Sequence, residues 1–158
     1  MNKNIFLRNL KYEDINKNYL SWFNNIQISK YIYASKKIST IKELKNYYLN
    51  KKKDNKVLFL AILNYKKKHI GNIKFESLKK NSKKIYMGIM IGNKNYVNKG
   101  ISKIIFKKAE RKFFKKFGIK SYYANVNPLN KIALNAYLKN NFKLLKKSKN
   151  NIELIKYL

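Results

Sequence analysis

Cysteine is absent from this sequence, and histidine, proline and acidic residues are scarce. Without cysteine the chain has no disulfide, no thiolate metal ligand and no cysteine nucleophile. The single histidine, His69, follows three lysines in an expected hairpin turn, so a serine–histidine–aspartate triad could be built only there. We expect a structural or solvent-exposed role for His69 and predict no metal site.

Long hydrophobic runs are also missing. No apolar run is long enough to span a membrane, and residues 1–10 lack the basic and then apolar pattern of a signal peptide. A cytoplasmic protein is therefore expected. At 158 residues with 45% hydrophobic content, the chain can bury a core, and its length suggests a single domain over residues 1–158.

Negative charge is rare, with 7 acidic residues against 38 basic ones and a formal net charge of +31. Such a chain attracts polyanions, which makes non-specific nucleic-acid binding one interpretation. However, only Arg8 and Arg111 are arginines, and lysine occurs in every segment instead of on one face. We favour drift toward A/T-rich codons over selected nucleic-acid binding. The field should still favour anionic ligands such as coenzyme A and nucleotide diphosphates.

The most informative segment runs from Ile85 to Phe117: an apolar strand, a polar loop around Gly100 and then a long helix. The start of a helix has unpaired N–H groups and a partial positive charge, so such a loop can hold a phosphate. Gly100 would let backbone and ligand approach closely. The loop Val97–Ser102 matches neither the Walker A motif nor G-x-G-x-x-G.

The remaining pattern predicts alternating strands and helices. Glu13–Asn25 is expected as one helix with Ile15, Tyr19, Trp22 and Phe23 in the core, and Thr40 and Glu43 have capping-box spacing for the next helix. Gly118 is expected to end the long helix, and Asn130 to begin a short one. Strands are expected over 4–10, 57–64, 69–77, 84–92, 119–126, 142–146 and 152–157.

This layout resembles the GNAT superfamily of N-acetyltransferases. The matching residues after the long helix are Asn130, Ala133, Tyr137 and Phe142, in the N-x-x-A/S-x-x-x-Y pattern that precedes G-F in the family. Phe6–Arg8, Tyr19–Asn25 and His69–Lys74 look like the branch of ribosomal-protein N-terminal acetyltransferases and nucleotide-amino-sugar acetyltransferases. The resemblance implies an α/β (α+β) fold whose mixed, mostly antiparallel sheet is splayed around the cofactor, with helices on both faces.

The resemblance also implies that acetyl-coenzyme A (acetyl-CoA) is the cosubstrate and that Tyr137 protonates its leaving thiolate. A phenol has an ordinary pKa of about 10 and so carries its proton at neutral pH. Backbone N–H groups near Gly88–Met90 would meet the oxyanion and the pantetheine. The predicted cofactor-binding residues are Ile89, Met90, Ile91, Val97, Asn98, Lys99, Gly100, Ile101, Ser102 and Asn130.

The general base is less well defined by the sequence. Met87 stands where the family often has a carboxylate on the central strand. Alternation along its strand places Glu76 on the face opposite Ile73 and Phe75, where it could accept the amine proton directly or through water. The alternative is that Glu76 is a salt-bridge partner.

The expected activity is transfer of an acetyl group from acetyl-CoA to a primary amine, by a monomer or homodimer. We favour a nucleotide-linked amino sugar as the acceptor, because its diphosphate is attracted by the positive chain and because Tyr19–Asn25 looks like the early helix of such enzymes. One alternative is an N-terminal acetyltransferase of the ribosomal-protein type. The other is a noncatalytic polyanion-binding protein on the same fold.

Overall fold

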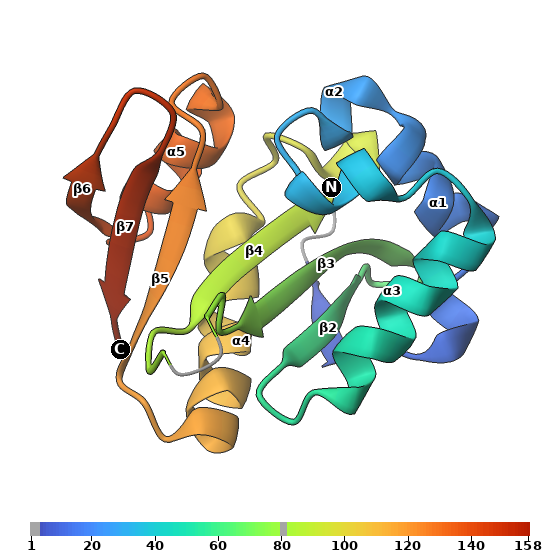
Figure 1. The fold of residues 1–158 in the computed structure, drawn as a ribbon, viewed down its shortest axis with the longest axis horizontal. Coiled ribbons are helices and arrows are strands. Elements are labelled where there is room, and N and C mark those ends of the chain that lie inside the picture. The colour runs from blue at the N-terminus through green and yellow to red at the C-terminus, as the bar shows by residue number, and fades with distance from the viewer. Residues whose placement is uncertain (1–3, 80–81) are drawn as a thin grey trace.

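A mixed sheet of seven strands lies at the centre of the structure, a computed structural model that describes residues 4–79 and 82–158 except for the side chain of Ser35 (Figure 1). The strand order is β1-β2-β3-β4-β5-β7-β6. All neighbouring strands pair antiparallel except β4 and β5, which pair parallel. The expected mixed, mostly antiparallel fold is confirmed.

Each strand lies within two residues of its predicted position. The strands are β1 (Phe6–Asn9), β2 (Leu58–Leu63), β3 (His69–Glu76), β4 (Tyr86–Ile91), β5 (Ser121–Val126), β6 (Lys143–Lys147) and β7 (Ile152–Tyr157). The α-helices are α1 (Lys17–Asn24), α2 (Ile26–Ser29), α3 (Ile41–Lys53), α4 (Ser102–Phe117) and α5 (Lys131–Leu138). Short 3₁₀ helices are η1 (Tyr12–Asp14), η2 (Tyr33–Lys37) and η3 (Lys94–Tyr96).

The predicted helix ends agree with their capping chemistry. Thr40 Oγ1 accepts a hydrogen bond from the backbone N–H of Glu43, and the Glu43 carboxylate accepts one from the backbone N–H of Thr40. This reciprocal pair satisfies two free donors at the start of α3. Gly118 ends α4 with a φ of 66°, a left-handed conformation that glycine adopts without steric cost.

The prediction of one continuous helix over Glu13–Asn25 was wrong. The segment is divided into η1 and α1, because both oxygens of Asp14 are bound by Arg8 at 2.6 and 2.7 Å and the backbone N–H of Lys11 also donates to Asp14. A new helix then begins at Asn16, whose side chain accepts from the N–H of Tyr19. The core residues predicted for this segment are nevertheless buried: Ile15, Tyr19, Trp22 and Phe23.

Helices cover both faces of the sheet, as predicted, but not equally. On one face, α4 and α5 bury a large core against the sheet, including residues of β5 and β7. On the other face, α1 and α3 cover a smaller core that includes residues of β2 and β4 (Figure 1). Among the described residues, none from β5, β6 or β7 belongs to this second core. On this second face, α1 and α3 therefore leave the part of the sheet formed by β5 and β7 uncovered.

The chain contains no helix, among the residues that the structure describes, of the length and hydrophobicity needed to cross a bilayer.

Candidate active site

The strands β4 and β5 begin side by side and then separate. Within the described residues, the one pair between them is Tyr86 and Tyr123, and the backbone N–H of Tyr123 donates to the carbonyl of Ile85 at 2.9 Å. Figure 1 shows the two strands diverging toward their C-terminal ends. Beyond Tyr86, the edge of β4 that faces β5 has no strand partner within the described residues. Separation of two parallel strands leaves backbone groups free to bind a ligand.

The loop after β4 has the geometry of an anion site. Asn98 and Gly100 have left-handed φ angles of 57° and 69°, and both are exposed together with Lys99. A left-handed residue next to a right-handed one can turn successive backbone N–H groups toward one side, and such a concave surface can bind an anion. A Cβ atom added to Gly100 would meet no other atom within 4 Å, so this side of the loop is open to a ligand.

The start of α4 adjoins this loop and is not capped by a side chain. Its N-cap residue is Ile101, which is buried and cannot supply a capping oxygen. The first N–H groups of α4 are therefore available to a phosphate, reinforced by the partial positive charge of the helix end. Ser102, the first residue of α4, accepts a hydrogen bond from the Asn140 side chain at 3.3 Å, which links the start of α4 to the residues that follow α5.

The predicted cofactor residues on β4 have their side chains in the two cores. Ile89 and Ile91 pack against the core under α4, whereas Met90 is buried in the core under α1 and α3. Val97, after η3, is half-buried. Any contact of the three β4 residues with a cofactor would therefore use their backbone groups.

Tyr137 lies on α5, on the side of the sheet covered by α4. Its ring packs on Phe142 and Phe106, with centroids 4.9 and 5.9 Å away. Burial raises the pKa of Tyr137 above the ordinary value for tyrosine, so the phenol is protonated at neutral pH. Within the described residues the hydroxyl makes no hydrogen bond. The ring is therefore part of the core under α4.

Asn130 occupies the N-cap position of α5. Its Oδ1 accepts a hydrogen bond from the backbone N–H of Ala133 at 3.1 Å. This is the structural role that asparagine often has at a helix start. The side-chain amide donors of Asn130 are the groups that this cap leaves unused.

Glu76, the predicted base, is held by two lysines at the end of β3. Its carboxylate lies 2.5 Å from Lys51 Nζ and 2.5 Å from Lys74 Nζ, and Lys74 also donates to the hydroxyl of Tyr47. Burial alone would raise the pKa of Glu76, but the two ammonium groups lower it on balance. The structure thus supports the salt-bridge alternative. Met87 is buried in the core under α4.

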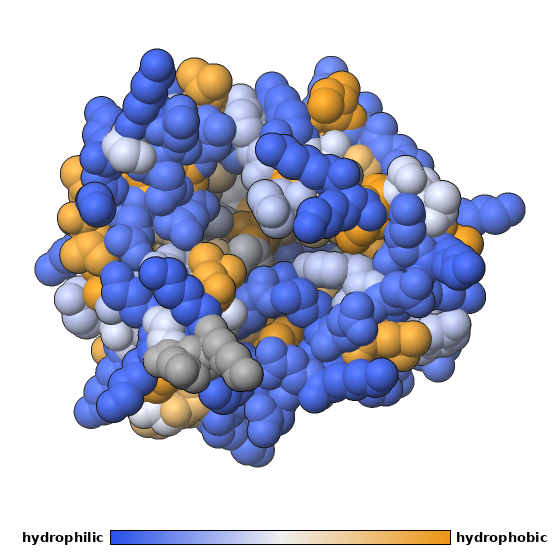
Figure 2. Space-filling view, viewed as in Figure 1, coloured by the Kyte–Doolittle hydropathy of each residue, from blue (hydrophilic) through white to orange (hydrophobic). Residues whose placement is uncertain are grey.

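A polar cluster that was not predicted from the sequence lies on the open face of β4, which is the side that carries Tyr86 and the exposed Gly88. It consists of Lys84, Tyr86, Tyr123 and Glu153, from the strand β4 and the residues before it, β5 and β7. Gly88 is exposed above the same junction, with no atom within 4 Å of a Cβ added there. Figure 2 shows this mainly hydrophilic face hollowed over β4. Strand alternation could have indicated Glu153, since its neighbours Ile152 and Leu154 face the core.

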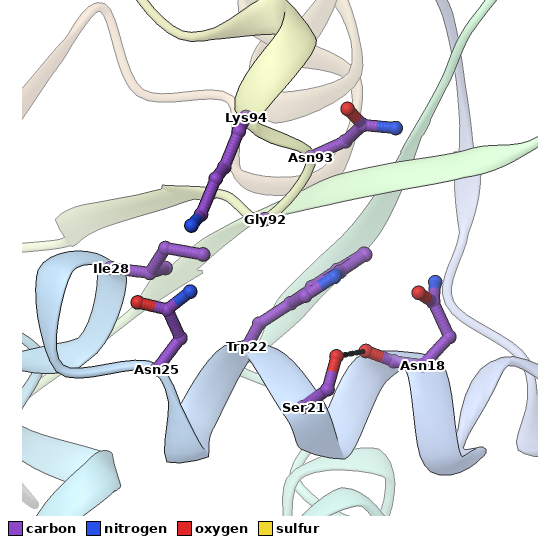
Figure 3. Close-up of a pocket in the computed structure, with 8 residues that line it drawn as sticks. All are labelled: Asn18, Ser21, Trp22, Asn25, Ile28, Gly92, Asn93 and Lys94. Atoms are coloured by element: carbon purple, nitrogen blue, oxygen red, sulfur yellow. Dashed lines mark hydrogen bonds between the residues drawn. The ribbon is translucent and has the colours of Figure 1, made fainter.

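A separate pocket of 240 Å³ lies between α1, α2 and the connection after β4. Figure 3 shows Lys94 reaching from that connection toward Ile28 and Asn25, with the Trp22 indole beneath Gly92. A Cβ atom added to Gly92 would lie 1.9 Å from an atom of the Trp22 ring, so only glycine fits there. The close packing of this glycine and tryptophan fixes α1 against the end of β4.

His69 has a structural role, as expected. It begins β3 and packs edge-on against the rings of Trp22 and Tyr19, at 4.9 and 5.5 Å. One ring nitrogen bonds the Asn72 side chain at 2.8 Å, and burial lowers the pKa of His69. No group of three or more histidine, cysteine or acidic side chains in the described part of the chain could hold a metal ion.

Comparisons with known proteins show the family and the fold of this chain. The family described as "Acetyltransferase (GNAT) domain" matches residues 4–143. None of the curated proteins matches the chain. Among solved structures, a domain from Methanocaldococcus jannaschii is similar with a TM-score of 0.80 at 21% identity, covering 98% of this chain and 99% of that one.

Two enzymes of known acetyltransferase activity have the same fold. The spermidine N-acetyltransferase from Vibrio cholerae, solved with CoA and spermine, has a TM-score of 0.82 at 17% identity and coverage of 99% and 96%. The aminoglycoside acetyltransferase AAC(6')-Ib, solved with coenzyme A, has a TM-score of 0.76 at 13% identity and coverage of 98% and 95%. Because the family match extends over most of the sequence, the chain belongs to the GNAT acetyltransferases and is an acetyl-CoA-dependent N-acetyltransferase.

Proposed function

We propose that residues 1–158 act as a single domain that transfers the acetyl group to a nucleotide-linked amino sugar on the open face of β4. One observation supports the cofactor site: β4 separates from β5 beyond Tyr86. This separation comes directly before an exposed loop and a helix without a side-chain cap. The pantetheine would lie along Ile89–Ile91, and the pyrophosphate would bind the N–H groups of residues 97–102. Asn130 would contribute its amide donors. A cytoplasmic location would supply acetyl-CoA.

Tyr137 is the proposed acid. Attack of a neutral amine on the thioester carbonyl forms a C–N bond, and the tetrahedral intermediate breaks its C–S bond. The phenol proton passes to the departing sulfur, and a proton lost from nitrogen replaces it. Backbone N–H groups at Gly88–Met90 are proposed to bind the oxyanion. Glu76 was predicted as the base, but Lys51 and Lys74 hold its carboxylate, which makes it a weak proton acceptor and favours a role as a salt-bridge partner.

The charge of the chain supports a nucleotide-linked acceptor. A net charge of +31 attracts a diphosphate and repels basic protein termini over a Debye length of about 8 Å at physiological salt. The segment Tyr19–Asn25 no longer adds support, because Tyr19, Trp22 and Phe23 are core residues and their pattern reflects packing.

The acceptor is tested by incubating the protein with acetyl-CoA and a panel of amines and weighing the products by mass spectrometry. The panel contains UDP- and dTDP-linked amino sugars, N-terminal peptides, spermidine and an aminoglycoside. We expect acetylated nucleotide sugar. Turnover of peptides alone would favour the ribosomal-protein type of activity. Turnover of spermidine or the aminoglycoside alone would show that local contacts with the acceptor outweigh the overall positive charge of the protein.

Non-specific binding of polyanions is the property that the net charge of +31 would add to this enzyme. Thermal melting at moderate salt tests acetyl-CoA and polyanions separately, because a ligand that binds the folded state stabilises it by mass action. Stabilisation by acetyl-CoA that persists in salt supports the proposed cofactor site. Stabilisation by duplex DNA that is lost as salt rises would show non-specific binding through charge.

A further inference from the structure

A primary ammonium group already lies on the open face of β4. Lys84 Nζ is 3.2 Å from Glu153 Oε1 and 4.6 Å from the centroid of the Tyr123 ring. A carboxylate and an aromatic face each attract an ammonium ion, the first through a charge-assisted hydrogen bond and the second through a cation–π interaction. The Lys84 side chain ends in a primary amine, which is also the reacting group of the expected acceptor.

The Glu153 carboxylate is fixed in place by Tyr86, whose hydroxyl donates to Oε1 at 2.5 Å. The Tyr86 and Tyr123 rings lie 5.5 Å apart. Lys146, opposite Glu153 on β6, adds positive charge. The Tyr86 hydrogen bond is the main reason that the pKa of Glu153 lies below its ordinary range, so this carboxylate is ionised at neutral pH. The Glu153 carboxylate therefore keeps its negative charge at neutral pH.

Strand register places this charge at the opening between β4 and β5. Tyr86 pairs with Tyr123, so Gly88 and Asn125 are each two residues farther along parallel strands. Glu153 pairs with Asn125 on the next strand. Counted from the Tyr86–Tyr123 pair, Glu153 corresponds to Gly88, where the face is open and the backbone is proposed to bind the oxyanion. An ammonium group bound to Glu153 would lie where an acceptor must approach.

We propose that Glu153 and Tyr123 form the binding site for the acceptor ammonium group, and that Lys84 occupies it until the acceptor displaces it. This inference rests on the proposed function and names the residues that recognise the amine. Lys84 can leave the site readily, because its side chain is 44% exposed, whereas Glu153 is 15% exposed and stays with Tyr86. The Lys84 ammonium group therefore competes with the acceptor for binding to Glu153 and Tyr123.

The test compares steady-state kinetics of three variants, using whichever amine the panel identifies. Glu153→Gln removes the negative charge and should raise the acceptor KM by about tenfold or more, since a hydrogen bond to a charged group is lost. Lys84→Met removes the competitor and should lower the acceptor KM by roughly threefold or more. Lys83→Met, with the same charge change on the neighbouring exposed residue, should leave KM unchanged.

Two further measurements separate recognition from stability and from the proposed function. Glu153→Asp keeps the charge and should recover part of the affinity, with melting temperature measured for each variant. Calorimetry with butylamine and butanol on the CoA-loaded protein needs no turnover, and wild type should prefer the amine while Glu153→Gln should not. If wild type acetylates no amine but shows this preference, the proposed function fails and the ammonium site stands.

The proposal is overturned by either of two results. One is a folded Glu153→Gln variant with the acceptor KM and the butylamine affinity of wild type. The other is an increase of the acceptor KM in Lys84→Met as large as that in Glu153→Gln, which would mean that Lys84 only supports the strands.

Discussion

The hydroxyl of Tyr86 donates a hydrogen bond to Glu153 across 2.5 Å, although the two residues are 67 positions apart in the sequence. The bond passes over β5, because β7 lies on the far side of β5 from β4. Burial, together with this bond, raises the pKa of Tyr86 to about 12. Donor and acceptor are therefore fixed at neutral pH, and the junction of β4 and β5 is held at the point where the strands begin to separate.

Replacing Gly100 with aspartate should abolish measurable acetyl-CoA binding while the fold persists. The new carboxylate would face the phosphate site, and the left-handed φ of 69° would cost about 1 kcal/mol for a residue with a Cβ. Isothermal calorimetry measures the affinity, and circular dichroism measures the fold. Asn95→Asp adds the same charge in η3 and is the matched control. A folded Gly100→Asp variant with normal affinity would contradict the assignment of the loop.

Replacing Tyr137 with phenylalanine should lower the turnover number by roughly 100-fold or more with little change in acetyl-CoA affinity. Stability should hardly change, because the ring keeps its contacts with Phe106 and Phe142 and the hydroxyl makes no hydrogen bond within the described residues. Normal turnover with a large loss of melting temperature would show that Tyr137 is only a core residue.

Stability should depend on the ionised state of Asp14. Burial alone would raise its pKa, but the hydrogen bonds from Arg8 and the Lys11 backbone lower it on balance. A lowered folded-state pKa stabilises the protein above the unfolded value of about 3.9, and this contribution disappears as pH falls through the folded value. Asp14→Asn should therefore lower the free energy of unfolding by about 1–3 kcal/mol at pH 7.

The pH dependence of this difference can be measured by urea unfolding between pH 3 and pH 7. The stability gap between wild type and Asp14→Asn should be constant above about pH 5 and shrink below about pH 4. The exposed neighbour Glu13 provides the comparison, since Glu13→Gln should leave the curve of wild type unchanged. If the stability difference between wild type and Asp14→Asn does not vary with pH, the charge of Asp14 is not what stabilises the protein.

Replacing Gly92 with alanine should destabilise the protein by about 1–3 kcal/mol, because the new methyl group would overlap the Trp22 ring. Gly88→Ala is the matched control, since its methyl group would meet no atom within 4 Å. Thermal unfolding of both variants gives the comparison. Equal melting temperatures would mean that α1 moves away from β4 without cost.

Local sequence signals predicted most elements correctly because their chemistry acts over a few residues. The reciprocal pair of Thr40 and Glu43 and the left-handed end at Gly118 depend only on nearby backbone. The break within Glu13–Asn25 was missed because Arg8, on a different element, binds Asp14 and interrupts the helical pattern. Periodicity still identified the buried side chains correctly, because Tyr19, Trp22 and Phe23 all lie within α1, where the helical spacing holds.

The candidate site divides in the same way. The loop around Gly100 and the spacing from Asn130 to Tyr137 could be recognised in the sequence, since each lies within one strand–loop–helix unit. The role of Glu76 could not, because its partners Lys51 and Lys74 come from two elements and one of them is 25 positions away. In a chain with 38 basic residues, composition does not indicate which lysines approach which carboxylate.

By itself, the sequence determined the order of the strands and of the longer helices, an exposed glycine loop before α4 and a protonated tyrosine after it, because hydrophobic period, glycine and capping residues act locally. Only the tertiary structure decided which polar side chains share the open face of β4. Lys84, Tyr123 and Glu153 meet there because β5 and β7 pair beside β4, and strand pairing is a long-range choice that no local pattern specifies.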